Sequence, residues 1–272
     1  MKNHRSSSSS SLFLLLSSLL LATSAAAQPA PPPPAPPQAP AATAQPLPTA
    51  AELLDGVDRN MTFDARRTRM VMSVEGRRTR TFEMIAFSRG EEDSAIEYIS
   101  PPREKGTRML KLADELWLYL PTVERVQKIS GHMLRQGMMG SDLSYEDLMA
   151  SRELRSSYEA KVTGDDVVEG RPCWVVQMTA RDQGVSYPKR TSCIDKEMFI
   201  PLRQELFALS GMLLKTWTMS DVKDFGGRKF PTKMVIQDHV KKDSVTRLEF
   251  KEMEFGVKHP AEVFSLRWLE RR

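Results

Sequence analysis

Short stretches in which apolar and polar residues alternate fill most of the chain after residue 60. In Thr68–Gly76, Met70, Met72 and Val74 occupy alternate positions. A period of two is typical of β-strands, because successive side chains point to opposite faces of a sheet. We count about eleven or twelve such strands: Thr68–Gly76, Arg80–Gly90, Ser94–Pro102, Gly106–Asp114, Glu115–Pro121, Tyr158–Asp166, Arg171–Ala180, Val185–Asp195, Phe199–Gly211, Leu213–Val222, Lys229–His239 and Val245–Glu254.

These stretches are short, end in glycine, proline or charge, and follow one another without intervening helices. Such spacing predicts a mainly β protein in which one sequence-ordered meander forms an antiparallel sheet. The sheet, of about eleven strands, is expected to curl into a barrel or half-barrel with a few covering helices. In Glu115–Pro121, leucines occupy one face and Trp117 and Tyr119 the other. Because both faces are apolar, helices or a bound apolar ligand must cover the second face.

Two regions depart from the strand pattern. Thr49–Met61 has apolar residues at helical spacing and a threonine that can cap its first turn, so it predicts an amphipathic helix. Gly131–Glu153 has no period of two and predicts one long insert between strands. Within it, Ser144 and Asp147 have the spacing of a helix cap, for a short helix that runs to about residue 151. Gly137 and Gly140 are expected to be turns or hinge points.

The N-terminus predicts an exported protein. Lys2 and Arg5 precede an apolar run, Leu12–Ala22, that is too short to span a bilayer, and three alanines follow it. We therefore expect a signal peptide over residues 1–27, with a periplasmic or extracellular mature chain. Residues 28–48 hold ten of the eighteen prolines and no charge, which indicates a disordered Pro/Ala-rich linker. Residues 49–272 then form the folded domain.

Composition excludes some functions. The formal charge of +4 falls to about +2 without the signal peptide, and basic and acidic residues are interspersed, so a nucleic-acid groove is not expected. The mature chain has three histidines far apart in sequence and no zinc, nucleophile-elbow or phosphate-loop motif, so we expect no enzyme, cofactor or metal. Asp142, Glu146 and Asp147 could suggest a metal site, but their spacing fits no calcium loop and a capped helix start explains them better.

Methionine is the unusual residue, with sixteen in the chain. Its unbranched, polarizable side chain repacks around variable apolar partners, although it also serves as core filler. For Met138 and Met139, which lie among glycines and polar residues, we favour a mobile apolar lid. Cys173 and Cys193 flank a turn whose middle is residue 183, so in a hairpin centred there they face each other and can form a disulfide.

Five motifs resemble the outer-membrane lipoprotein-sorting (LolA-like) proteins, and in particular a bacterial subgroup associated with lipid-exporting transporters. They occur in the expected order over a core from Ala51 to Arg272: Gly106–Leu110, Leu116–Pro121, Arg125–Gly131, Met139–Leu148 and Val263–Arg272. The resemblance implies a half-open antiparallel barrel with an apolar cavity for acyl chains, and carriage without catalysis or cofactor.

We therefore expect a periplasmic carrier that moves lipids or lipoproteins towards the outer membrane. An inner-membrane transporter and an outer-membrane acceptor are the expected protein partners. The alternative is a lipid-binding accessory or sensor module of a transporter or signalling system, and a hydrolase is a third reading. The expected cavity wall comprises Leu110, Leu118, Leu120, Trp174, Met178 and Trp217, and the expected lid comprises Met133, Met138, Met139 and Leu148.

Overall fold

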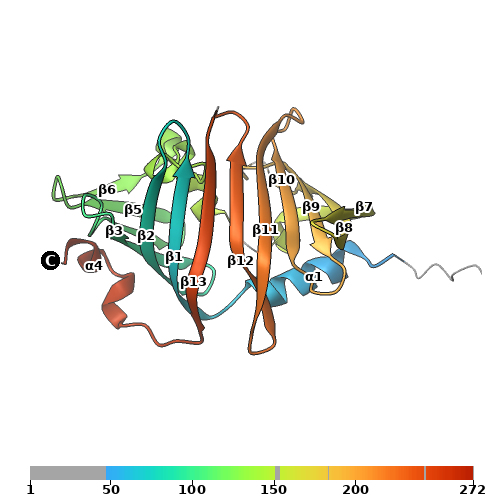
Figure 1. The fold of residues 1–272 in the computed structure, drawn as a ribbon, viewed down its shortest axis with the longest axis horizontal. Helices are drawn as coiled ribbons and strands as arrows, with labels where there is room; N and C mark the ends of the chain where they lie inside the picture. The colour runs from blue at the N-terminus through green and yellow to red at the C-terminus, as the bar shows by residue number, and fades with distance from the viewer. Residues whose placement is uncertain (1–46, 151–153, 183, 242, 272) are drawn as a thin grey trace, which may run out of the picture. The chain divides into compact units, whose positions relative to one another are not determined.

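One antiparallel β-sheet with helical segments against both of its faces makes up the fold (Figure 1). The structure is a computed structural model and describes residues 47–150, 154–182, 184–241 and 243–271. In these residues the sheet has thirteen strands: β1 (Ala65–Glu75), β2 (Arg80–Arg89), β3 (Asp93–Ser100), β4 (Arg108–Leu112), β5 (Glu115–Leu120), β6 (Arg125–Ile129), β7 (Tyr158–Val168), β8 (Arg171–Ala180), β9 (Lys189–Asp195), β10 (Pro201–Phe207), β11 (Leu213–Phe225), β12 (Arg228–Asp238) and β13 (Val245–Phe255). The helical segments are α1 (Ala50–Met61), η1 (Gly131–Arg135), η2 (Met138–Gly140), α2 (Tyr145–Met149), α3 (Leu154–Ser157), η3 (Ala261–Phe264) and α4 (Leu266–Glu270).

The sheet consists of two meanders. The first and last strands of the folded chain pair with each other and so join the two meanders into one sheet. One meander runs from β1 to β6 and the other from β7 to β13, and β1 pairs antiparallel with β13 in the middle of the sheet. The edge strands β6 and β7 do not pair with each other, so the sheet stays open. The predicted open antiparallel sheet is confirmed. The expected single meander is wrong, because the first and last strands are neighbours.

β6 is the strand that the sequence pattern does not predict. Its residues are mostly exposed or half-buried, and only Ile129 is buried. An edge strand with one partner has little apolar surface to bury, so its alternation is weak. The remaining strands agree with the predicted positions, which raises the count from the expected eleven or twelve to thirteen.

α1 begins where the sequence predicts. The Thr49 hydroxyl accepts a hydrogen bond from the Glu52 backbone N–H, and the Glu52 carboxylate accepts one from the Thr49 N–H, which forms a capping box. Leu53, Leu54 and Val57 pack with residues of β7, β8 and β9. α1 therefore fills one face of the second meander.

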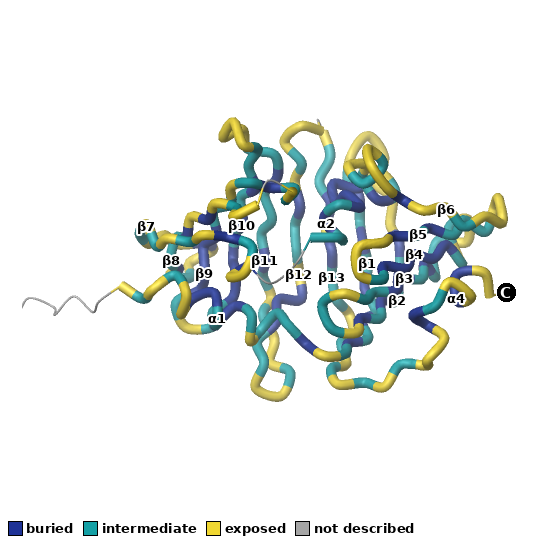
Figure 2. Tube along the Cα trace, turned by 180° about the vertical axis from the view of Figure 1, so that it is seen from behind, coloured by how far each residue is buried: buried dark blue, intermediate teal, exposed yellow. Residues whose placement is uncertain are grey.

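We define the inner face of the sheet as the one on which Met72, Met84 and Ile236 are buried. The segment from residue 131 to residue 150, hereafter the insert, packs on this face through buried residues such as Met138 and Leu143. Figure 2 shows α1 and α2 on the same side of the sheet. The predicted insert, without strands of its own, is confirmed for its described residues.

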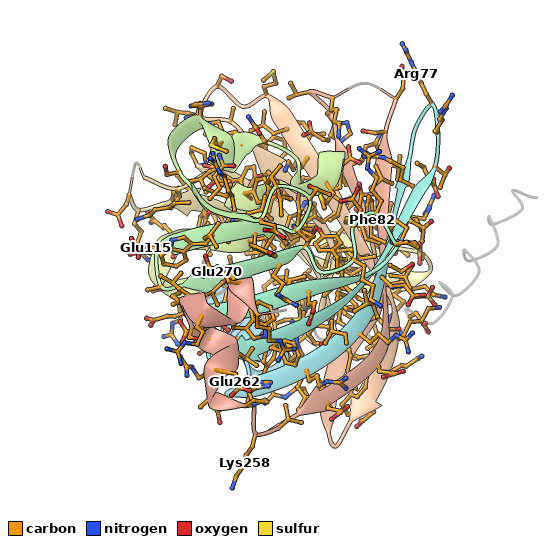
Figure 3. All side chains as sticks on the ribbon, turned by 90° about the vertical axis from the view of Figure 1, so that its left-hand side faces the viewer. Arg77, Phe82, Glu115, Lys258, Glu262 and Glu270 are labelled. Atoms are coloured by element: carbon orange, nitrogen blue, oxygen red, sulfur yellow. A yellow bond between two sulfur atoms is a disulfide. The ribbon has the colours of Figure 1, made fainter. Side chains whose placement is uncertain are left out.

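The C-terminal segment covers part of the opposite, outer face. Val263 and Trp268 are buried against Ala95 and Leu110 in a separate apolar cluster. In Figure 3, Glu262 and Glu270 mark this segment beside the strands of the first meander. Helical cover on both faces explains why the strands of the first meander are apolar on both sides.

Cys173 and Cys193 form a disulfide, but they are not directly opposite each other. Cys173 pairs with Asp195 and Cys193 with Val175, so the register differs by two residues from the expected hairpin centred on residue 183. This register places Pro188 just before β9, where its carbonyl accepts a hydrogen bond from the Ala180 N–H. Pro188 thus accepts one bond at the end of the β8–β9 ladder, and because proline has no N–H it cannot donate the reciprocal bond.

The expected signal peptide (1–27) and nearly all of the expected linker (28–48) lie outside the described residues. No helix in the described ranges has the length and apolar character that crossing a membrane requires.

Candidate functional site

The middle of the inner face holds a cavity of about 240 Å³. The inner sides of the central strands, the insert and the end of α1 bound it. Its apolar lining consists of Val57, Met61, Met70, Met84, Ala86, Ile96, Met138, Leu143, Leu148, Ala150, Leu154, Pro201, Leu206, Trp217, Met219, Phe230, Met234, Leu248 and Phe250. Its polar lining consists of Arg66, Ser88, Ser94, Asp147, Tyr187, Arg190 and Gln204. A concave, mostly apolar site with a few polar groups is typical of small-molecule binding.

Methionines form a large part of the cavity wall. The strand residues Met70, Met84, Met219 and Met234 line it from β1, β2, β11 and β12. Met138 is the methionine that the insert contributes to this lining. Methionine therefore gathers on the sheet more than on the insert, and gives the wall an adaptable surface.

Hydrogen bonds fix the insert over the sheet at Asp142. Its carboxylate accepts from the Ser244 hydroxyl and the Thr246 hydroxyl, each at 2.6 Å, and its backbone N–H donates to Thr246 Oγ1 at 2.8 Å. Gly137 allows the preceding turn, because a Cβ atom there would lie 2.1 Å from the Ser141 carbonyl oxygen. The acidic residue at this position thus attaches the insert to β13.

A second attachment is buried at the edge of the cavity. Asp147 Oδ2 accepts hydrogen bonds from Lys215 Nζ at 2.5 Å, from the Ser144 backbone N–H at 2.7 Å and from the Ser144 hydroxyl at 2.8 Å. Asp147 Oδ1 accepts from the Tyr187 hydroxyl at 2.5 Å. Burial, and then the charge of Asp147, raise the pKa of Tyr187, so it remains a donor at neutral pH. This network ties α2 to β11 and to the segment before β9.

The predicted capping role of Ser144 and Asp147 is confirmed, and α2 ends at Met149. No group of three or more acidic, histidine or cysteine residues in the described ranges could hold a metal ion. Protein donors bond both carboxylates, Asp142 and Asp147, so neither needs an ion.

Two arginines place positive charge in the cavity lining. Arg66 is only 6% exposed, and its guanidinium lies 4.1 Å from the ring centroid of Phe63 and 5.3 Å from that of Phe230. Arg190 lies between two tyrosines, 4.8 Å from the Tyr158 ring and 5.5 Å from the Tyr187 ring. Cation–π contacts of this kind help to hold a guanidinium in place.

Three of the ten residues expected to contact a ligand line the cavity: Met138, Leu148 and Trp217. Leu118, Leu120, Met133 and Met139 lie in or against the apolar cluster under the insert, outside the cavity lining. Trp174 and Met178 lie in or against the cluster that α1 fills. Leu110 faces the C-terminal segment on the outer face.

Leu110 shows that even-numbered residues on different strands need not face the same side of the sheet. In the register of β4 and β5, Met109 pairs with Leu118 and Leu110 pairs with Trp117. Leu110 and Leu118 therefore point to opposite faces, although both have even numbers. The register between strands, which the sequence pattern does not give, sets the face.

Sequence reasoning missed the polar residues of the cavity, above all Arg190 and Gln204, and it also missed Lys215 at the buried attachment of the insert. No sequence signal marks Arg190, because Ser192 to Asp195 on β9 are buried on both faces and the alternation favours neither. Tyr187 and Lys215 carry no signal either, because their partner Asp147 is distant in sequence.

The chain resembles a family and several solved structures. A family model described as an uncharacterized protein matches residues 90–271, more than half of the chain. The chain belongs to this family. No curated protein matches the sequence.

Three solved structures of other proteins superpose well on this family member. A domain from Vibrio parahaemolyticus, provisionally assigned as an outer membrane lipoprotein-sorting protein, has 24% identity and a TM-score of 0.71, and the match covers 81% of this chain and 97% of that domain. A DUF1329 family protein from Desulfovibrio piger has 22% identity and a TM-score of 0.72, over 80% of this chain and 96% of that one. A LolA superfamily protein from Nitrosomonas europaea has 21% identity and a TM-score of 0.68, and the match covers 82% of this chain and 100% of that one. The fold is therefore LolA-like, which confirms the resemblance at the level of the fold.

Proposed function

We propose that this protein is a periplasmic carrier that binds acyl chains of lipids or lipoproteins and moves them towards the outer membrane. The observation that supports this most is the apolar, methionine-lined cavity under the insert. The fold is also that of a protein assigned to lipoprotein sorting.

The cavity has the physical properties that a carrier needs. Each methylene that leaves water is stabilised by roughly 0.8 kcal/mol, so an acyl chain requires an apolar cover to cross an aqueous space. Methionine side chains adapt to chains of different shape and can release them. The cavity of about 240 Å³ lies below the ~300–1,000 Å³ typical of ligand sites, so we propose that the insert moves outward when a chain enters.

The compartment and the partners belong to the same proposal. A signal peptide over residues 1–27 would export the chain, and the disulfide between Cys173 and Cys193 suits an oxidising compartment. A linker over residues 28–48 would precede the carrier domain, residues 49–272. An inner-membrane transporter would supply the cargo, and an outer-membrane acceptor would receive it.

Mass spectrometry of apolar molecules extracted from the protein, purified from its native host, tests the binding step. The expected result is a lipid or acylated peptide in near-stoichiometric amount. Transfer of that molecule between donor and acceptor vesicles then tests carriage. Binding without transfer would favour an accessory or sensor module, and the absence of any acyl ligand, together with no binding of added lipid, would contradict the proposal.

A further inference from the structure

Two hydrogen-bond donors in the cavity lining have no acceptor. The Nε atom of Arg190 and the Nε1 atom of Trp217 are buried, and neither has a hydrogen-bond partner among the described residues. An unpaired buried donor destabilises the folded protein, and most buried polar groups in native proteins are bonded. A ligand that supplies acceptor oxygens at this place would remove that destabilisation.

The register brings these donors to one end of the cavity. Trp217 on β11 pairs with Gln204 on β10, and Gln204 pairs with Ser192 on β9. Arg190 lies two residues from Ser192 and therefore points to the same face. Strand spacing and rise put the Cα atoms of Arg190 and Trp217 roughly 12 Å apart, a gap that two long side chains can close to the size of a head group.

Arg190 has no negatively charged partner in the described part of the chain. No ion pair to its guanidinium occurs there, and its contacts are the rings of Tyr158 and Tyr187. The nearby carboxylate of Asp147 is already bonded to Lys215 and to the Tyr187 hydroxyl. The charge of half-buried Arg190 is therefore available to a ligand in the cavity, where a charge-assisted hydrogen bond is stronger than a neutral one.

The scaffold around Arg190 holds it in position before any ligand arrives. The Tyr158 hydroxyl donates to the Tyr187 carbonyl oxygen at 3.0 Å, and the Tyr187 hydroxyl donates to Asp147. Both rings that contact the guanidinium are thus fixed by hydrogen bonds. A pre-positioned donor loses little conformational freedom on binding, which favours affinity.

We propose that Arg190, Gln204 and Trp217 form a head-group subsite, which binds the anionic oxygens of an acyl ligand while its chain lies on the methionine wall. The shared chemistry of the head is an anionic carboxylate or phosphate. This inference rests on the proposed acyl-chain carrier, and it adds the charge of the cargo.

The subsite is tested by displacement of the neutral apolar dye N-phenyl-1-naphthylamine. The three competing ligands share a twelve-carbon chain and differ only in their head group. Dodecanoate, dodecyl phosphate and dodecanol would compete for the wild-type protein and for the variants Arg190→Met, Arg190→Lys and Trp217→Phe. The matched control is Lys189→Met, which removes the same charge from the adjacent, exposed position of β9. Thermal unfolding of every variant checks the fold.

We expect the wild type to bind at least one anionic ligand about tenfold more tightly than dodecanol. Arg190→Met should abolish this preference by weakening the anionic ligands far more than dodecanol, while Arg190→Lys should keep part of it. Trp217→Phe removes the N–H together with part of the ring, so it should weaken anion binding about threefold more than it weakens dodecanol binding. Preference for dodecanoate or for dodecyl phosphate identifies a carboxylate or a phosphate head.

Equal affinity of the wild type for all three ligands, or equal loss in Lys189→Met and Arg190→Met, would overturn the subsite and leave the carrier proposal intact. Failure of the wild type to bind the dye and every ligand would overturn the carrier proposal and the subsite with it. If Arg190→Met does not fold, the Trp217→Phe and Arg190→Lys variants decide the result.

Discussion

At the scale of single residues, a buried ion pair holds the insert to the sheet. The side chains of Lys215 and Asp147 are 7% and 0% exposed, and they lie 2.5 Å apart. Removing one partner of a buried pair leaves an unneutralised charge out of water, and this costs far more than the pair itself contributes. Lys215 and Asp147 should therefore depend on each other.

Lys215→Met should lower the free energy of unfolding by about 3–5 kcal/mol, because it leaves the Asp147 carboxylate buried without its cation. Adding Asp147→Asn to this variant should restore part of the loss, since the neutral amide can still accept from Ser144. Urea unfolding of the wild type, both single variants and the double variant measures the coupling. Additive losses would show that the two residues act independently.

A second buried carboxylate makes stability depend on pH. Asp195 accepts hydrogen bonds from Arg171 Nε at 2.6 Å and from the backbone N–H groups of Glu197 and Met198. Burial raises the pKa of Asp195, but the hydrogen bonds from Arg171 and the two backbone groups outweigh it, so the pKa is lowered below its usual 3.8. The charged carboxylate thus stabilises the turn between β9 and β10.

Asp195→Asn should lower the free energy of unfolding by about 1–3 kcal/mol at pH 7. Because the folded pKa is below the unfolded one, the contribution is complete well above pH 3.8 and disappears as the pH falls through the folded pKa. The difference in the free energy of unfolding between the variant and the wild type should therefore narrow below pH 3.8, as urea titrations would measure. Asp114→Asn, at an exposed position, is the control, and a gap that stays constant down to pH 2 would contradict the argument.

At the scale of elements, the insert is both a cover and a wall. Its neighbouring methionines have different positions, since Met138 is 2% exposed and lines the cavity, whereas Met139 lies outside the lining, half-buried against the apolar cluster. The insert is outside the strand ladder and is attached mainly through Asp142 and Asp147. A change at its inner surface should alter binding more than folding.

Met138→Asp should weaken binding of N-phenyl-1-naphthylamine about tenfold or more, because a charge would enter the apolar cavity. Met139→Asp makes the same substitution one residue away and should change the affinity less than about twofold. Dye titration gives both affinities, and circular dichroism confirms that the sheet is intact. Unchanged binding by a folded Met138→Asp variant would remove the insert from the binding site.

The disulfide belongs to the β8–β9 hairpin. It joins residues 20 positions apart in sequence. In the chain-entropy model, closing a loop of this size raises the free energy of unfolding by about 3 kcal/mol. Replacing both cysteines by serine should lower the free energy of unfolding by that amount. Thiol labelling of the unreduced, denatured wild type should find no reactive cysteine, and two labelled cysteines would exclude the bond.

At the scale of the whole sheet, the cavity lies where the covering elements leave space. α1 fills the inner face of β7, β8 and β9, and the insert fills that of the opposite half. The strands between them, which include the β1–β13 pair, form the apolar wall of the cavity that the insert and α1 border. A ligand that fills this space contacts both halves of the sheet and should stabilise them together.

Saturating acyl ligand should therefore raise the melting temperature. At a free concentration of one hundred times Kd, binding adds about 2.7 kcal/mol, which corresponds to roughly 5–10 °C for a domain of this size. Differential scanning fluorimetry with dodecanoate measures the shift, and the Met138→Asp variant should show a much smaller one. An equal shift in both proteins would indicate binding elsewhere.

The sequence by itself determined most of the elements, although not β6, and the class of fold. Alternation at positions such as Met70, Met72 and Val74 gave the strands, because one face of each strand is buried. The capping residues Thr49 and Ser144 gave the starts of α1 and α2, because a cap involves only neighbours within three residues. These features are local, so they can be read along the chain.

The tertiary structure decided which strands are neighbours and which faces meet. The pairing of β1 with β13, the two-residue shift between Cys173 and Cys193, and the outward direction of Leu110 all depend on register between strands. Apolar residues on both faces fit either orientation, so the pattern alone could not choose. The polar groups of the cavity, such as Arg190, come together only because strands distant in sequence lie side by side.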